Sequence, residues 1–327
     1  MYPHSRCPPS VEAGNVTSRK RLIVVLALFA IGLGVAFAIE AGWAPRAAPT
    51  ARRADAAAPL RPAQRIVSTA PSVVELLFAI GAGELLVGVG DWCSHPPEAR
   101  RLPSVGGEFN PSFEQILALR PDLVVVQGRG EKLEAFCTHH GIPMLRINTD
   151  TLARLRSDLR QLGRAVGREA EADRLAASIQ GDLAAVAARV AGRPRPRVFL
   201  CMSHSPGSLR GLSTAHGASL LSELLDIAGG ENVLGDVPLA YPPVSKEQLI
   251  QREPEVILDL HPGEELSDEA RSLLLADWQA VASLPAVRSG RIHVLTDDAL
   301  LIPGPRVPLV ARRLAEVLHP EAMAVPP

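Results

Sequence analysis

Two fifteen-residue stretches share one pattern and decide the fold of this 327-residue chain. The first is residues 112–126, SFEQILALRPDLVVV, and the second is residues 245–259, SKEQLIQREPEVILD. Serine, glutamate, glutamine and proline keep the same spacing in both, and an acid and an apolar run follow each proline. Serine is a favoured helix N-cap, and a first-turn glutamate suits the positive end of the helix dipole. Each stretch therefore predicts a short helix that ends at the proline, followed by a buried parallel strand.

A shorter pattern precedes each of these copies. Glu-Leu-Leu begins at Glu75 in the first half and at Glu223 in the second, and each tripeptide is followed by a glycine, Gly81 or Gly229. Two motifs that recur in the same order in both halves indicate two lobes of one design.

The rest of the chain alternates between strand and helix patterns. Strands are expected at 65–69, 86–89, 122–126, 143–147, 198–202, 255–259 and 292–295. Further helices are expected at 72–80, 132–140, 218–227, 273–282 and 307–318, the first with a capping box formed by Ser72 and Glu75. Between them, residues 151–192 carry apolar residues at helical spacing and predict two helices, or one interrupted near 163–167. The predicted fold is α/β, with two Rossmann-like lobes that have parallel sheets and are joined by a long helical connector.

The front of the chain predicts export. Basic residues 19–21 precede an apolar run, 22–39, so residues 1–40 fit either a signal peptide or a membrane anchor. Residues 41–64 are rich in Ala and Pro and predict a disordered tether. The body is expected in the periplasm, or outside the cytoplasm and anchored in the inner membrane by residues 22–39. It divides into an N-terminal lobe (65–150), a connector (151–192) and a C-terminal lobe (193–320).

Composition and motifs argue against several functions. A net charge of −1 gives no basic face for nucleic acid. Ser203 and His204 are adjacent on an extended segment and so cannot form a nucleophile–base pair, and we expect no enzyme and no catalytic residue. No phosphate-binding loop is present, so no cofactor is expected.

Cysteines and histidines do not predict a metal site. There is no C-x-x-C motif, no Cys/His zinc spacing and no pair of histidines at i and i+4, so no metal ligands are expected. Cys93, Cys137 and Cys201 are expected as buried thiols in preference to a Cys93–Cys137 disulfide.

The expected site is a cleft between the lobes, because ligands of open α/β sheets bind at the carboxyl ends of the strands. Trp92 and Tyr241 fall in such loops, one in each half. An aromatic residue on each wall suits a large, flat and partly apolar ligand.

The chain resembles the periplasmic binding proteins of ABC importers for vitamin B12, ferric siderophores and haem. The resemblance covers residues 65–320 and rests on these motifs: Arg65-Ile66-Val67-Ser68-x-Ala70-Pro71-Ser72-x-x-Glu75, Val87-Gly88-Val89, Pro96-Pro97-Glu98-Ala99, Leu119-Arg120-Pro121-Asp122-Leu123, Gly229-Gly230-Glu231-Asn232, Val244-Ser245-x-Glu247-Gln248 and Pro303-Gly304-Pro305-Arg306. It implies that Glu114 and Glu247, one on each lobe, dock the loaded protein onto arginines of the permease dimer. The implied partners are therefore the permease and ATPase subunits of an ABC importer.

The resemblance also implies ligand-binding residues. Trp92, Tyr241 and Asp298 stand where the vitamin B12 branch has cleft residues, which favours cobalamin or a related corrinoid. Other cleft aromatics of that branch appear here as Glu108 and Gln127, a departure that keeps other ligands open.

Ferric siderophores are usually held by Arg and Tyr. Arg129 and Arg306 therefore support the alternative of a ferric siderophore or haem. A metal-ion receptor that uses histidines and an enzyme are the remaining alternatives.

Overall fold

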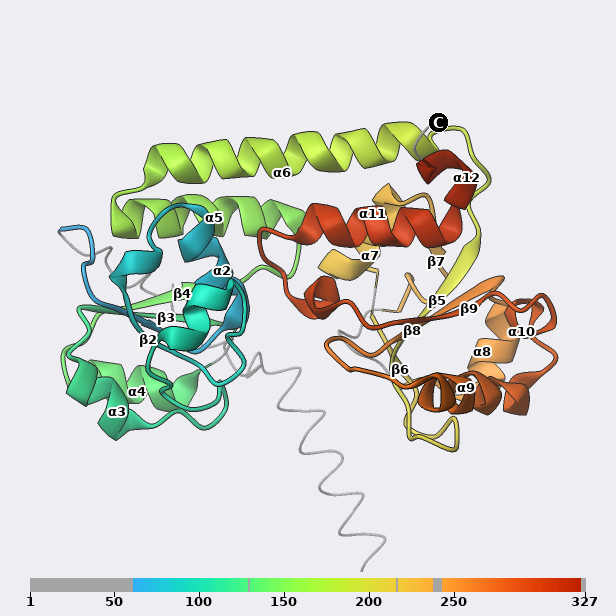
Figure 1. Cartoon of the computed structure of the whole chain (residues 1–327), viewed down its shortest axis with the longest axis horizontal. Coiled ribbons are helices and arrows are strands. Elements are labelled where there is room, and N and C mark those ends of the chain that lie inside the picture. The colour runs from blue at the N-terminus through green and yellow to red at the C-terminus, as the bar shows by residue number, and fades with distance from the viewer. Residues whose placement is uncertain (1–60, 129, 216, 238–242, 325–327) are drawn as a thin grey trace, which may run out of the picture. The chain divides into compact units, whose positions relative to one another are not determined.

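The computed structural model describes residues 61–128, 130–215, 217–237 and 243–324, which form two sheets, one from each half of the chain (Figure 1). The predicted signal or anchor, residues 1–40, lies outside these residues, as does the predicted tether up to residue 60. Within the described part of the chain, no helix is both long and apolar enough to span a membrane.

The first sheet has four parallel strands in the order β2-β1-β3-β4. The strands are β1 (Ile66–Ser68), β2 (Leu86–Val89), β3 (Leu123–Gln127) and β4 (Met144–Ile147). Successive side chains of a strand point to opposite faces. Leu123 and Val125 accordingly face α2 (Pro71–Ala79) and α5 (Leu152–Val166), whereas Val124 and Val126 face α3 (Phe113–Leu119) and α4 (Glu131–His139).

The second sheet repeats this plan with two added edge strands. Its core is the parallel set β5 (Arg197–Ser203), β8 (Val256–Leu260) and β9 (Ile292–Leu295), while β6 (Ser213–Thr214) runs antiparallel and β7 (Glu231–Asn232) parallel to β5. The predicted parallel sheets are thus confirmed, but β6 and β7 were missed because a two-residue strand carries no periodic pattern.

Helices cover both faces of the second sheet. The remaining helices and 3₁₀ turns are η1 (Gly83–Leu85), η2 (Pro97–Arg101), α6 (Glu169–Val190), α7 (Leu220–Ile227), α8 (Lys246–Arg252), α9 (Asp268–Asp277), η3 (Trp278–Val281), α10 (Pro285–Arg288), η4 (Asp298–Leu301), α11 (Val307–Leu318) and α12 (Pro320–Met323). Val198 and Leu200 of β5 pack on the side of α6, α7 and α11, whereas Phe199 and Cys201 pack with Trp278 of η3 on the other side.

The duplicated stretch forms the same structure twice. Helices α3 and α8 are each seven residues long, and their N-caps Ser112 and Ser245 accept hydrogen bonds from backbone N–H groups three residues on. Both helices end in a left-handed residue, Arg120 (φ 47°) or Glu253 (φ 45°), which directly precedes the proline.

The acid after each proline accepts a hydrogen bond from the backbone at the start of a neighbouring strand. Asp122 Oδ1 accepts a hydrogen bond from Arg65 N at 2.9 Å, just before β1, and Glu255 Oε2 accepts one from Arg197 N at 2.9 Å, at the start of β5. This shared contact explains why both copies carry an acid at that position.

The connector consists of two helices, which is one of the two arrangements that the sequence left open. Helices α5 and α6 lie side by side, and the chain reverses at Gly167, whose φ is 68° (Figure 1). α6 extends past α5 to pack against α11, α12 and α7 of the C-terminal half. Gly163 permits the close approach of α5 and α6, because a Cβ on it would lie 2.6 Å from Ala172 Cβ.

The predicted capping box at the start of α2 is wrong. The N-cap is Ala70 and makes no side-chain hydrogen bond, since Pro71 already occupies the first turn. Ser72 instead donates a hydrogen bond to Gln127 Oε1 of β3, and Glu75 binds Arg306. Both polar groups are held by tertiary contacts, which override the local motif.

Candidate functional site

A cavity of about 370 Å³ is lined by residues from both halves of the chain. From the first half come Gln127 at the end of β3 and residues 149–151 between β4 and α5. From the second half come Met202 of β5, the start of α7 and residues 299–303 after β9. The carboxyl ends of β3, β4, β5 and β9 thus meet at this cavity, as expected for a ligand site in open α/β sheets.

The cavity combines apolar walls with a few polar groups. Leu220, Leu221, Leu224 and Val310 supply apolar surface, and Arg154 supplies a positive charge. Two helices begin here: α5, capped by Thr151, and α7, capped by Ser219.

The two repeated glutamates of the Glu-Leu-Leu motifs each accept hydrogen bonds from a segment that is distant in the sequence. Glu75 on α2 accepts two hydrogen bonds from Arg306, at 2.9 Å from Nε and 2.6 Å from Nη2. Glu223 on α7 accepts one from the backbone N–H of Leu152, the first residue of α5, at 2.6 Å. Sequence reasoning did not identify these two residues as functional, although the repeat that contains them was the available signal.

Arg306, predicted as a ligand contact, lies within this network. It is the N-cap residue of α11, and besides Glu75 it donates to Asp298 Oδ1 at 2.7 Å. Burial opposes the charge, but the hydrogen bonds to Glu75 and Asp298 outweigh it and raise the pKa of Arg306. The structure therefore places both Arg306 and Asp298 in ion pairs within the protein, and neither lines the cavity.

Trp92 and Glu108 lie on one loop of the N-terminal half. Trp92 is 78% exposed and Phe109 is 93% exposed, the two most exposed of the large apolar residues in the described part of the chain. Asp91 N donates to Gly106 O at 3.1 Å, and its carboxylate accepts from Ser104, so the two arms of this loop are tied together. Partial loss of hydration raises the pKa of Glu108.

Two predicted ligand residues, Arg129 and Tyr241, lie outside the described residues. Their roles stay predictions.

Glu114 and Glu247, the predicted docking residues, are exposed in the first turns of α3 and α8. Neither has an ion-pair partner among residues 61–324 as the structure describes them. Hydrogen bonds from its own backbone N–H and from Ser245 lower the pKa of Glu247. Both carboxylates are therefore available to a partner.

Cys93, Cys137 and Cys201 are buried free thiols, as predicted. Burial raises the pKa of Cys93 to about 12 and that of Cys137 to about 11.

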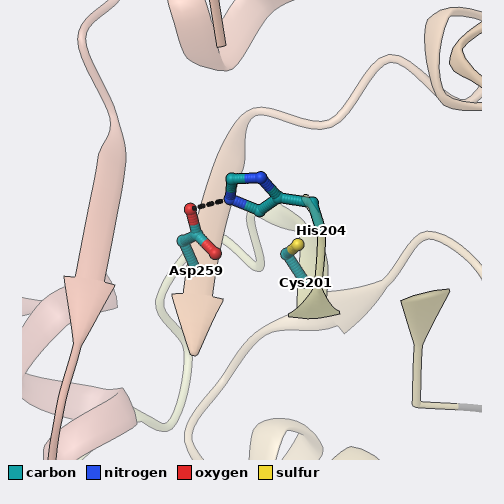
Figure 2. A group of neighbouring side chains, drawn as sticks. All are labelled: Cys201, His204 and Asp259. Carbon is teal, nitrogen blue, oxygen red and sulfur yellow. Dashed lines mark hydrogen bonds and ion pairs between the residues drawn. The ribbon is translucent and has the colours of Figure 1, made fainter. Parts of the chain in front are cut away.

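A buried polar cluster, Cys201, His204, Asp259 and His261, was not predicted as a unit. Figure 2 shows the side chains of Cys201, His204 and Asp259 pointing toward one another. His204 Nε2 donates to Asp259 Oδ2 at 3.1 Å, and Trp278 Nε1 donates to the same oxygen at 3.0 Å.

Burial and these hydrogen bonds shift the pKa values of the three side chains. The hydrogen bond to Asp259 raises the pKa of His204 to about 9. Burial favours the neutral acid, but the hydrogen bonds from His204 and Trp278 outweigh it and lower the pKa of Asp259. Burial and the neighbouring Asp259 raise the pKa of Cys201.

Comparisons with known proteins agree with this architecture. The periplasmic binding protein family model matches residues 66–299. A vitamin B12-binding protein of Vibrio parahaemolyticus is 31% identical over 75% of this chain and 86% of its own length, and one of Pectobacterium carotovorum is 28% identical over 78% and 88%.

Solved structures include two kinds of binding protein. The periplasmic vitamin B12-binding protein of Vibrio cholerae superposes with a TM-score of 0.66 at 26% identity, covering 81% of this chain and 99% of that one. A periplasmic haem-binding protein of Pseudomonas aeruginosa gives a TM-score of 0.68 at 28% identity, covering 79% and 93%. These relatives are binding proteins, not enzymes, and their two-lobed fold matches the two sheets described above. The chain belongs to the periplasmic binding protein family.

Proposed function

We propose that this protein captures cobalamin or a related corrinoid in the cavity between its two sheets and delivers it to an ABC importer. The observation that carries the proposal is the cavity itself, which draws its walls from both halves of the chain. The vitamin B12-binding relatives support the choice of ligand.

The chemistry of the site suits a flat macrocycle. Apolar side chains of α7 and α11 line the cavity, and the exposed Trp92 and Phe109 offer ring surface on the N-terminal half. A corrinoid has apolar ring faces and a rim of amides. The ring faces match the apolar and aromatic side chains, and the amides match hydrogen-bonding groups such as Gln127 and Thr149.

Haem is the second candidate ligand. Arg154 at the cavity provides a cation for carboxylate side chains such as haem propionates, and the haem-binding protein of Pseudomonas aeruginosa is as similar in structure as the vitamin B12-binding one.

Titration of the purified full chain with cyanocobalamin, haemin and a ferric siderophore separates these ligands. Absorption spectra and quenching of tryptophan fluorescence report binding. We expect one cyanocobalamin per chain, bound in the micromolar range or tighter. Preferential binding of haemin would favour the second candidate, and binding of none of the three would refute the proposed function.

We also propose that Glu114 and Glu247 dock the loaded protein onto the permease. The support is their matched positions in the repeat, their exposure and their lack of ion pairs within the described residues. Surface ion pairs add little affinity but fix orientation and speed encounter.

The double variant Glu114→Ala/Glu247→Ala tests this role in reconstituted transporter. Ligand affinity should stay unchanged, and stimulation of the transporter ATPase should be lost. Glu131→Ala/Glu269→Ala is a matched control, because both residues are exposed first-turn glutamates outside the repeat. Full stimulation by the first double variant would exclude the docking role.

We further propose that residues 22–39 bring the body to the outer face of the inner membrane, as a signal peptide or as an anchor. The basic flank and the apolar run support this placement. Fractionation of cells with an antibody against the body tests it: protein in the periplasm or on the outer face of the membrane is expected, and a cytoplasmic pool would contradict it.

A further inference from the structure

The buried cluster on the second sheet contains atoms that no hydrogen bond explains. Asp259 Oδ1 and His261 Nε2 are both buried, and neither has a hydrogen-bond partner among the described residues. The two atoms nevertheless face each other at 3.2 Å. Burying a carboxylate oxygen and an imidazole nitrogen without partners is costly, and a cation between them would satisfy both.

The strand register builds this cluster. β5 and β8 pair in parallel with Cys201 opposite Asp259, so their side chains leave the sheet on the same face. His204 follows directly after β5, and His261 follows directly after β8. The sequence patterns Cys-x-x-His and Asp-x-His thereby converge at the carboxyl ends of two adjacent strands.

We propose that Cys201, His204, Asp259 and His261 form a binding site for one divalent metal ion of the zinc type. One thiolate, two imidazoles and one carboxylate are the ligand types that zinc prefers over magnesium or calcium.

Three of the four ligands, Cys201, His204 and Asp259, already lie close enough to share one ion, and His261 contacts the other oxygen of the Asp259 carboxylate. Two ligands at 2.0–2.1 Å from a tetrahedral zinc lie roughly 3.3 Å apart. The Nε2–Oδ2 distance from His204 to Asp259 is 3.1 Å, and the distance from His261 Nε2 to Asp259 Oδ1 is 3.2 Å. Ligand atoms of Cys201, His204 and Asp259 all lie within 4.8 Å of one another, so the sulfur needs to approach the others by roughly 1 Å.

A supporting shell around the ligands is already in place. Metal-bound histidines usually donate their second N–H to a carbonyl or carboxylate. His204 Nδ1 lies 3.2 Å from Ser208 O, and His261 Nδ1 lies 3.5 Å from Glu264 Oε2. Trp278 Nε1 fixes the Asp259 carboxylate.

The proposed metal site lies near the surface and is separate from the solute cavity. The His261 side chain is 15% exposed, so the cluster lies just below the surface, although the Nε2 atom itself is buried. Cys201 and Met202 are neighbours on β5 and point to opposite faces, and Met202 lines the cavity, so the sheet separates the two sites. On binding, the proton of the Cys201 thiol and any proton on His204 Nε2 pass to solvent, so that the thiolate sulfur and the free nitrogen can bind the ion.

Cobalt(II) is the probe that tests this site, because it substitutes for zinc and is coloured. The chelator-treated full chain is titrated with Co²⁺ and then with Zn²⁺. We expect one Co²⁺ per chain with tetrahedral visible bands and a sulfur-to-cobalt charge-transfer band, both abolished by equimolar Zn²⁺. The zinc dissociation constant should be on the order of 1 µM or tighter.

Variants assign the ligands. Cys201→Ser should remove the sulfur band, and His261→Ala should weaken Zn²⁺ binding at least tenfold. Cys137→Ser is the matched control, since it alters another buried free thiol and should leave both readouts unchanged. Circular dichroism verifies that each variant is folded. If Cys201→Ser does not fold, His261→Ala alone tests the site, because His261 is the least buried of the four residues.

Two results would overturn the proposal: wild-type protein that binds neither ion with one-to-one stoichiometry, or binding that Cys201→Ser and His261→Ala both leave unchanged. Neither result bears on solute capture, because cobalamin binding is measured separately in metal-free protein.

Discussion

Replacing Glu75 by Gln removes the buried negative charge that faces Arg306. The Glu75 side chain is 1% exposed and that of Arg306 is 13% exposed, so water replaces little of the lost interaction. Breaking a buried ion pair by removing one partner costs about 3–5 kcal/mol. Asp298, which is 53% exposed, still contacts Arg306 at 2.7 Å and offsets part of that cost. We therefore expect Glu75→Gln to lower the free energy of unfolding by about 2–4 kcal/mol.

Equilibrium unfolding of the full chain in guanidinium chloride measures this loss as a shift of the midpoint. Asp298→Asn is the matched control, because it removes the other carboxylate from the same guanidinium at a half-exposed position. That change should cost no more than about 1 kcal/mol. The double variant Glu75→Gln/Arg306→Met should recover more than about 1 kcal/mol relative to Glu75→Gln alone, because no buried charge is then left unpaired. A loss below about 0.5 kcal/mol for Glu75→Gln, or equal losses for both carboxylates, would refute the role of this pair in joining the halves.

Two further predictions test packing and ligand contact. Gly163→Ala should destabilise the protein by about 1–2 kcal/mol because its Cβ would meet Ala172, whereas Gly181→Ala, with open space around it, should stabilise by about 0.5–1 kcal/mol in the same denaturant assay. Equal effects of the two changes would contradict the close contact of α5 and α6. Trp92→Ala should weaken cyanocobalamin binding at least about tenfold without moving the unfolding midpoint, and Leu273→Ala, at another exposed apolar position, should change neither. Unchanged affinity for Trp92→Ala would remove this residue from the site.

Local patterns in the sequence were sufficient to predict the positions of most helices and strands. The serine caps and prolines of the repeat located α3 and α8, and the β-branched runs after them located β3 and β8. These features act over a few residues, and the observed structure satisfies them in place. The start of α9 was placed too late, at residue 273 in place of Asp268, because the first turn of that helix is polar and its cap, Ser267, was not recognised.

Contacts between distant segments were not predictable in this way. Glu75 and Arg306 are 231 positions apart, and nothing in the sequence around Glu75 distinguishes an ion-pair partner from a helix cap. The expectation that no metal ligands are present considered spacing along the chain alone. The cluster of Cys201 and Asp259 depends on the register of two strands, which only the structure supplies.

The location of the bound solute tests the central claim most directly. Hydrogen–deuterium exchange of the full chain is measured with and without saturating cyanocobalamin. We predict slower exchange in segments of both halves, namely 90–111, 149–154 and 297–303, and unchanged exchange in α9 at 268–277. Protection confined to one half, or found only in α9, would contradict capture between the two lobes.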